Sequence, residues 1–387
     1  MPEDWQNGGF GLYVHWPFCE AKCPYCDFNS HVVRQIDHGA WARAYVSELE
    51  RVASETPGRV LNTVYFGGGT PSLMMPETVA EVISTAQQLW TPANDIEITL
   101  EANPGSVEAA RFTGYREAGV NRVSMGVQAL NDSDLRRLGR IHTVDEARAA
   151  FDVARQIFDR VSFDLIYARQ DQSLADWEAE LNTALEMAAD HLSLYQLTVE
   201  EGTAFGDRYR RGTLRGLPND DLAADMYDLT QEICAAHGLP RYEVSNHARP
   251  GSESRHNLIY WHYGDYVGIG PGAHGRLTVD GVKYATESPK NPQAWLATAA
   301  KGSGETPRTK LTGLEQAEEY LMMGLRVSDG IDPARFEALS GRVLDMDVRQ
   351  NLVRLGMIED LGTKITVTDQ GIKVLNAVIS EFLSGEI

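Results

Sequence analysis

Short runs of β-branched and aromatic residues alternate with longer amphipathic stretches through the first half of the chain. The amphipathic stretches repeat their apolar positions with helical spacing; Pro76 can open one of them and Gly119 can close the next. Strands that alternate with helices predict right-handed βαβ units around a parallel sheet. We therefore expect an α/β fold, with six βα units over residues 1–200 that form an open or closed (β/α)6 barrel and carry its chemistry at the carboxyl ends of the strands. The predicted strands are 11–16, 61–67, 95–102, 122–128, 161–168 and 191–197, and the predicted helices are 38–55, 76–90, 106–118, 143–157 and 173–189.

The pattern changes after residue 200. A helix predicted over 219–237 precedes a region rich in glycine, histidine and aromatic residues at 241–286, and we expect an extension of the barrel over 201–300. A linker at 301–308 opens a small C-terminal domain over 301–387 with a winged-helix-like order of elements. Its predicted helices are 312–326, 332–339, 345–355 and 370–383, with a two-strand wing at 357–368. Eight Lys and Arg face thirteen Asp and Glu over 310–387, which favours a structural or protein-docking role over DNA binding.

The formal net charge of the 387-residue chain is −20. A chain this acidic is a poor candidate for general binding to phosphate backbones or anionic lipid, so we expect no nucleic-acid partner; a local basic patch stays compatible with this charge. No apolar run approaches the roughly 20 residues that a membrane span requires. The N-terminal sequence lacks a basic start followed by an apolar stretch, so we expect a cytoplasmic protein.

Three of the four cysteines lie together after the first predicted strand, where Cys19, Cys23 and Cys26 have the spacing C-x3-C-x2-C. Iron–sulfur clusters are held by cysteine thiolates, so three close thiols can hold three corners of a 4Fe-4S cluster and leave one iron open. Zinc would favour a matched second pair of ligands, and inert thiols are the other alternative. We predict the open cluster, and we place the remote Cys234 in the core because a free cysteine packs as a small hydrophobe.

The thiol motif, with the aromatic Tyr25 before its last cysteine, resembles the signature of the radical SAM superfamily. This resemblance implies a partial α/β barrel in which the open iron binds the amine and carboxylate of S-adenosylmethionine (SAM). One-electron reduction of the cluster would then cleave the sulfonium and produce a 5′-deoxyadenosyl radical. The protein would position and shield the cofactors.

Further motifs over residues 11–285 resemble those of one branch of this superfamily, the oxygen-independent coproporphyrinogen oxidases and heme chaperones. They are the lead-in Tyr-Val-His-Trp-Pro-Phe to Cys19, the segment Phe-Gly-Gly-Gly-Thr-Pro that starts at Phe66, and single polar residues at the next strand ends. Hydrogen bonds at the barrel rim and surface ion pairs are the alternative explanation of these polar residues. The SAM-binding residues that the resemblance implies are Tyr13, Tyr25, Gly68, Gly69, Thr70, Glu101, Gln128, Arg140 and Asp164.

Three features depart from the oxidase pattern. A fourth cysteine shortly after the third is absent, since Asp27 and Phe28 follow Cys26, and only 18 residues precede Cys19. Ala168, Arg169 and Gln170 replace the usual Gly-Leu-Pro, a change for which the sequence offers no functional account. The first two departures favour the HemW-type heme chaperones.

The motif His-Asn-x-x-Tyr-Trp, residues 256–261, matches the heme-binding motif of that group. On a helix, His256 and Tyr260 share a face, an imidazole is a normal ligand of heme iron, and aromatic neighbours such as Trp261 suit a flat macrocycle. A core histidine with an aromatic face is the alternative. Nearby candidates for a second heme ligand are His262, Tyr263 and His274.

We therefore expect a heme chaperone that binds heme, carries a SAM-ligated 4Fe-4S cluster, and transfers heme to an acceptor hemoprotein. An electron donor for the cluster is a further expected partner; a membrane location of the acceptor and a homodimer stay open. The alternatives are a coproporphyrinogen III oxidase that decarboxylates propionates by radical chemistry, and a radical enzyme acting on another substrate. No catalytic residue is assigned.

Overall fold

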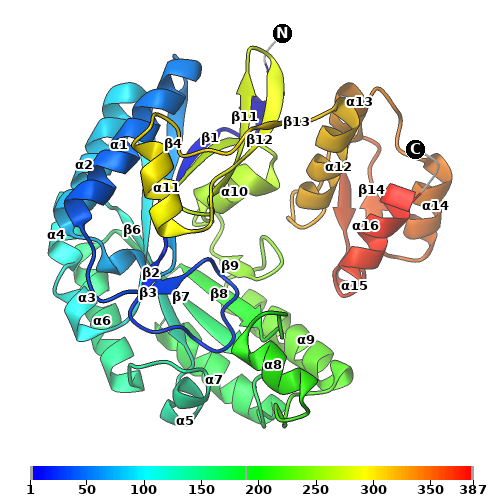
Figure 1. Ribbon diagram of the computed structural model, residues 1–387. Coiled ribbons are helices and arrows are strands. Elements are labelled where there is room, and N and C mark those ends of the chain that lie inside the picture. Colours follow the sequence, from blue (N-terminus) through cyan, green and yellow to red (C-terminus); the bar gives the residue numbers. More distant parts are fainter. Residues whose placement is uncertain (1–2, 188–189, 385–387) are drawn as a thin grey trace.

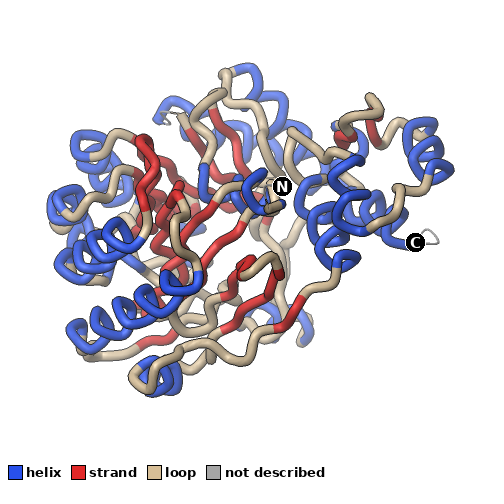
Figure 2. The backbone as a smooth tube through the Cα atoms, turned by 90° about the horizontal axis from the view of Figure 1, so that it is seen from above, coloured by secondary structure: helices blue, strands red, loops and turns tan. Residues whose placement is uncertain are grey.

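The computed structural model describes residues 3–187 and 190–384 (Figure 1). Six parallel strands form a partial barrel in chain order, with helices packed on its outer face (Figure 2). This confirms the predicted α/β partial barrel. The strands are β1 (Phe10–Trp16), β4 (Val60–Gly68), β5 (Thr91–Ala102), β6 (Arg122–Gln128), β7 (Arg160–Tyr167) and β8 (His191–Gln196), and the helices between them are α1 (His38–Glu55), α2 (Pro76–Leu89), α3 (Ser106–Ala109), α4 (Phe112–Glu117), α5 (Asp132–Arg137), α6 (Val144–Ile157) and α7 (Leu174–Met187).

The two faces of the barrel strands differ in chemistry. Successive side chains of a strand point to opposite faces, and Leu12, Val14 and Phe66 belong to the main hydrophobic core beneath the helices. The alternate positions point inward and are polar or aromatic: Tyr13 lies beside Tyr65. The barrel therefore contains a polar interior that opens at the carboxyl ends of its strands.

Strands from the second half of the chain extend both edges of the barrel into an eleven-stranded sheet. The sequence did not predict these strands: glycine interrupts the alternation of β10 at Gly268 and of β11 at Gly275, and the strands β9 and β13 are only two or three residues long. At Gly268 a Cβ atom would lie 1.9 Å from the carbonyl oxygen of His274, so the close pairing of β10 with β11 requires glycine. On the β1 side these strands are β10 (Asp265–Ile269), β11 (His274–Val279), β12 (Val282–Glu287) and β13 (Thr309–Lys310), and on the β8 side β9 (Asn246–Ala248).

Short elements complete the barrel region. The 3-10 turns are η1 (Asp4–Asn7) and η2 (Pro71–Leu73), and the strands β2 (Phe18–Cys19) and β3 (His31–Val32) bracket the thiol loop. The remaining helices of this region are α8 (Ala204–Arg210), α9 (Asp220–Ala236), α10 (Arg255–Trp261) and α11 (Pro292–Ala299). Among the helices that the structure describes, none combines the length and the apolar character needed to cross a membrane.

The C-terminal unit has its own hydrophobic core, to which Leu321, Phe336 and Ile365 contribute. Its helices and hairpin follow the predicted order, except that two helices stand where one was predicted over 370–383: α12 (Gly313–Gly324), α13 (Pro333–Ser340), α14 (Met346–Arg354), β14 (Ile358–Asp360), β15 (Ile365–Val367), α15 (Asp369–Ile372) and α16 (Leu375–Ser384). Ion pairs fasten this unit to the barrel region. The guanidinium of Arg335 lies 2.8 Å from the carboxylate of Asp4.

The segment that replaces Gly-Leu-Pro is a structural corner after β7. Ala168 has a positive φ of 58°, a conformation that normally favours glycine. The buried guanidinium of Arg169 lies 2.8 Å from Asp134 and 2.5 Å from Glu180, so it ties α5 to α7. Arg169 therefore anchors this corner through two ion pairs, a role that the sequence did not reveal.

We expect the Ala168→Gly protein to be more stable than wild type by roughly 0.5–1 kcal/mol. The left-handed conformation costs an L-residue roughly 1–2 kcal/mol, and the greater freedom of glycine in the unfolded chain offsets about half of that gain. Urea unfolding of both proteins measures the difference. In the control Ala149→Gly, within α6, the same change should destabilise by about 1 kcal/mol. Equal destabilisation at both positions would contradict the argument.

Candidate functional site

The three predicted cluster ligands lie on one loop above the barrel. Cys19 ends β2, and Cys23 and Cys26 follow in the loop that leads to β3. Backbone hydrogen bonds hold the start of this loop to the end of β4: the amide of Gly69 donates to Trp16 O at 2.7 Å and that of Thr70 donates to Phe18 O at 2.8 Å. All three thiols are half-buried, whereas Cys234 is fully buried, as predicted for a core cysteine.

The surroundings of the thiols suit a metal cluster. The hydroxyl of Thr70 donates to Cys19 Sγ at 3.4 Å, and Nη1 of Arg140 donates to Cys23 Sγ at 3.5 Å. Burial raises the pKa of Cys19 and of Cys26, and the neighbouring thiols raise both further. Three thiolates on one loop therefore need a cationic partner. Over residues 3–187 and 190–384, no group of three or more His, Cys, Asp or Glu side chains has metal-binding geometry.

The glycines at the end of β4 allow close packing within the protein. Gly68 has a φ of +113°, and a Cβ atom there would lie 2.5 Å from the imidazole of His15. A Cβ on Gly69 would lie 2.7 Å from the carbonyl oxygen of Phe18. In this structure the close approach made possible by glycine is to the thiol loop and its preceding strand.

Two carboxylates occupy the barrel interior below this strand end. Glu101 accepts hydrogen bonds from the hydroxyl of Tyr65 at 2.9 Å and from the amide of Gly68 at 3.1 Å. Burial raises the pKa of Glu101 to about 7 and that of Asp164, near Ser124, to about 6. Carboxylates in such surroundings are suited to bind a cation or hydroxyl groups.

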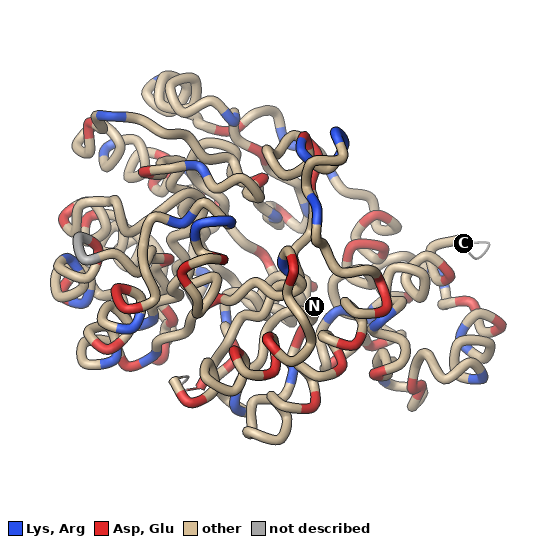
Figure 3. Tube along the Cα trace, turned by 90° about the horizontal axis from the view of Figure 1, so that it is seen from below, with Lys and Arg blue, Asp and Glu red and all other residues tan. Residues whose placement is uncertain are grey.

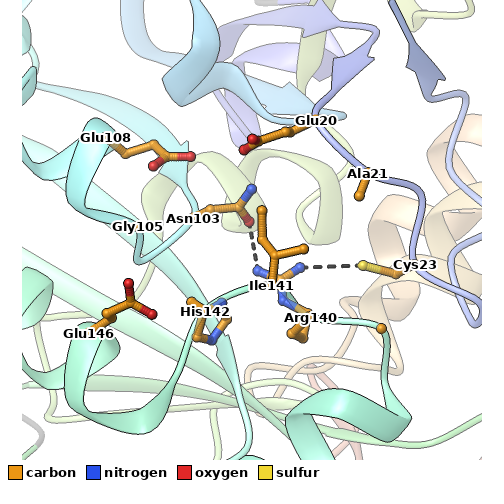
Figure 4. Close-up of a pocket in the computed structure, with 11 residues that line it drawn as sticks. Glu20, Ala21, Cys23, Asn103, Gly105, Glu108, Arg140, Ile141, His142 and Glu146 are labelled. Atoms are coloured by element: carbon orange, nitrogen blue, oxygen red, sulfur yellow. Dashed lines mark hydrogen bonds between the residues drawn. The ribbon is translucent and has the colours of Figure 1, made fainter.

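Arg140 connects the ends of β5 and β6 with the thiol loop. Its Nη2 donates to Asn103 Oδ1 at 2.7 Å and to Gly126 O at 2.8 Å. Arg140 and Cys23 line a cavity of about 160 Å³ beside the loop (Figure 4). Within the part of the chain that the structure describes, two buried polar atoms here lack a hydrogen-bond partner: Nε of Arg140 and Oε1 of Gln128.

The two unpaired atoms allow the polar groups of this site to be compared with those that a cofactor would offer. Buried polar groups in folded proteins are nearly always hydrogen-bonded, so a buried unpaired donor and acceptor at the barrel mouth indicate a ligand with matching groups. Gln128 also has a positive φ of 73°, a strained conformation of the kind found at ligand sites. The donors and acceptors present therefore fit a small polar cofactor beside the thiol loop.

The two aromatic residues assigned to SAM lie apart. Tyr13 lies in the barrel interior, with its hydroxyl 3.0 Å from Nδ1 of His15. Tyr25 belongs to the thiol loop itself, and its ring centroid is 6.4 Å from that of Phe205. The structure thus brings Gly68, Thr70, Glu101 and Arg140 together at the strand ends, and Tyr25 lies between Arg140 and Phe205 of α8.

The His-Asn-x-x-Tyr-Trp motif forms α10, which packs against β4 and β1. His256 is 1% exposed, and both of its ring nitrogens have partners: Nδ1 lies 2.6 Å from Thr63 Oγ1 and Nε2 lies 2.6 Å from Tyr260 Oη. Its ring stacks on Tyr65 at 4.9 Å, and burial lowers its pKa to about 3. Trp261 is half-buried. Heme coordination by His256 therefore requires α10 to move away from β4.

Sequence reasoning missed residues that connect these parts. Tyr65 contacts both His256 and Glu101, and the alternation of its strand places it on the same face as Gly67. Asn29 fastens the thiol loop to the barrel extension through hydrogen bonds from Nδ2 to Pro271 O at 2.8 Å and Lys290 O at 2.9 Å. No sequence pattern identified Asn29, because its partners lie more than 240 positions away.

The fold and the loop define a class of protein: a partial α/β barrel that presents three cysteines at the carboxyl ends of its strands. Residues 13–184 match the Radical SAM superfamily, and residues 311–374 match the HemN C-terminal domain. The chain therefore belongs to the radical SAM superfamily, in the family that includes heme chaperone HemW and radical S-adenosyl methionine domain-containing protein 1. Membership in this superfamily implies a 4Fe-4S cluster and SAM.

Relatives match most of the chain. Heme chaperone HemW of Escherichia coli is 36% identical over 96% of this chain and 98% of its own length. HemW of Bacillus subtilis is 35% identical over 97% of this chain and 99% of its own. The mitochondrial radical S-adenosyl methionine domain-containing protein 1 of Mus musculus is 40% identical over 87% of this chain and 77% of its own. The structure of coproporphyrinogen III oxidase (HemN) from Escherichia coli shares the fold, with a TM-score of 0.81 at 22% identity over 98% of this chain and 92% of that chain.

We expect SAM to bind more weakly as the pH falls through about 7 to about 6, where Glu101 and Asp164 take up protons. Both pKa values are raised, so protonation removes acceptors and negative charge from the site of a cationic ligand at only mildly acidic pH. Asp164→Ala should weaken binding by roughly 1–3 kcal/mol and remove the lower part of this pH dependence. Calorimetric titration of the reconstituted protein at several pH values measures both effects. Unchanged affinity in the variant would remove Asp164 from the SAM site.

Proposed function

We propose that this protein carries heme to an acceptor hemoprotein, and that a 4Fe-4S cluster with SAM controls the transfer. The observation that carries the proposal is the match, along nearly the whole length of both chains, to proteins named heme chaperone HemW. The absence of a fourth cysteine agrees with it. The position after Asp27 is occupied by Phe28, which is 58% exposed.

In this proposal Cys19, Cys23 and Cys26 hold the cluster, and Arg140 and Thr70 stabilise its thiolates by donating hydrogen bonds. Glu101, Asp164 and Gln128 bind the polar groups of SAM. When both cofactors are bound, they supply one-electron chemistry at the sulfonium. The chain's own contribution is to bind them at the strand ends and to keep the polar interior below them ordered.

Heme is the cargo, and we propose that the segment around α10 receives it with His256 as the iron ligand. In the geometry described here this histidine is closed off by Thr63 and Tyr260. The end of α10 is also held by the C-terminal unit: Nη1 of Arg335 donates to His262 O at 2.9 Å, and His262 Nε2 lies 3.2 Å from Asp329. Heme binding by His256 is therefore coupled to movement of α10 and to its contacts with the C-terminal unit.

Anaerobic reconstitution followed by two measurements on one preparation tests the proposal. Titration with heme should show a saturable one-to-one Soret change. Incubation with SAM, a reductant and coproporphyrinogen III should release no carbon dioxide. Substrate-dependent release of carbon dioxide without stoichiometric heme binding would instead identify an oxidase and overturn the proposal.

A further inference from the structure

An arginine-rich segment lies beside the thiol loop. Residues 203–217, which form α8 and the turn after it, contain four arginines against one acidic residue, Asp207. Acidic residues lie on both sides of this segment in the sequence, and the whole chain has a net charge of −20. Acidic and basic positions are otherwise interspersed along the trace in Figure 3. The segment is therefore a local basic patch on an acidic protein.

The arginines of this patch are accessible. Arg208, Arg210, Arg211 and Arg215 are all exposed, and Tyr209 between them is 61% exposed. Only Arg210 forms an ion pair in the described part of the chain, at 3.0 Å to Asp207. The other three guanidinium groups are thus free to meet carboxylates of a partner.

The patch is anchored directly to the loop that carries the cluster ligands. The amide of Phe205, in the first turn of α8, donates to Pro24 O at 2.8 Å, and the Phe205 ring contacts Tyr25. Pro24 and Tyr25 are the two residues between Cys23 and Cys26. Figure 1 shows the dark blue loop crossing in front of β7 and β8 toward α8. A protein bound to these arginines would therefore lie beside the cluster.

We infer that this basic patch, defined by Arg208, Arg211 and Arg215, is the docking site of an acidic electron-donor protein. The inference rests on the proposed function, because the cluster must be reduced from outside. A donor with a flavin hydroquinone anion gives up one electron and becomes the neutral semiquinone, while the oxidised cluster gains that electron and becomes reduced; no other group changes. Complementary charge speeds and orients such an encounter. A nucleic acid is a poorer fit, because an extended polyanion would reach beyond these arginines onto the acidic surface around them, whereas a compact acidic protein surface can be confined to the patch.

The test uses the reconstituted full-length protein and photoreduced flavodoxin as the acidic donor. We compare wild type with the triple variant Arg208→Glu, Arg211→Glu, Arg215→Glu, and follow cluster reduction by stopped-flow absorbance and electron paramagnetic resonance. At low ionic strength the rate of cluster reduction in the variant should be lower than in wild type by a factor of about ten or more. The wild-type rate should fall as salt is added, while the variant rate should change little.

A matched control is the triple variant Arg148→Glu, Arg342→Glu, Arg354→Glu, which makes the same change in net charge at exposed arginines on α6 and the C-terminal unit. It should be reduced as fast as wild type. Reduction by dithionite and titration with heme should be unchanged in both variants, so a failure of the proposed heme function would be recognised separately. Equal slowing in both triple variants, or none in the first, would overturn the docking site. So would RNA retention that is lost only in the first variant while its reduction rate is unchanged.

Discussion

The Cys23→Ala protein should fail to assemble a 4Fe-4S cluster. Three thiols on one loop are the only cysteines near the barrel mouth, since Cys234 is buried in α9, so the loss of one leaves two ligands for four irons. Cys23 also accepts the hydrogen bond from Arg140 that links the loop to β6 and α5. After anaerobic reconstitution we expect iron and sulfide contents near the background level and no broad absorbance in the visible region.

Cys234→Ala is the matched control, because it removes a thiol of the same chain without touching the loop. Its side chain packs in the core and burial raises its pKa to about 12, so it should stay a protonated thiol. The Cys234→Ala protein should bind the same iron and sulfide as wild type. Iron and sulfide uptake in Cys23→Ala equal to wild type, or uptake of zinc alone by wild type, would contradict the cluster assignment.

Heme binding should be lost in the His256→Ala protein, whereas the cluster and SAM should still bind. Loss of a direct metal ligand is a larger change than loss of a group that only orients a ligand, which commonly costs 10–100-fold in affinity, so we expect a decrease of about a hundred-fold or more. The proposed SAM residues and the cluster thiols lie on other elements. Heme titration, iron content and SAM calorimetry on the same preparation measure the three ligands.

Tyr260→Phe separates a ligand role of His256 from a packing role. This variant removes the hydroxyl partner of Nε2 and keeps the aromatic ring. If His256 coordinates iron, freeing Nε2 should leave heme affinity equal or higher and should accelerate binding. If His256 only packs in the barrel, His256→Ala should lower the free energy of unfolding without a specific effect on heme. Equal heme binding by wild type and a folded His256→Ala protein would remove this histidine as the ligand.

The sequence alone predicted the barrel well, because the signals it used are local. Alternation with a period of two and apolar repeats with helical spacing each report a single element, and α1 (His38–Glu55) and β6 (Arg122–Gln128) begin and end where they were expected. The thiol motif is equally local, since all its members lie within eight residues. The strands β10 and β11 were missed because close backbone pairing requires glycine at Gly268 and Gly275, and these glycines interrupt the side-chain alternation that sequence reasoning relies on.

What the sequence by itself determined is the class of fold, the thiol loop and the set of polar residues at strand ends. Only the tertiary structure decided what those residues contact. His256 and Thr63 are 193 positions apart, and their contact depends on α10 packing across β4. The ion pairs of Arg169 with α5 and α7, and the contact of α8 with the thiol loop through Phe205, were likewise decided only by packing. Periodicity and spacing describe the chain over a few turns or one strand, whereas a contact between distant positions depends on strand order, register and helix packing.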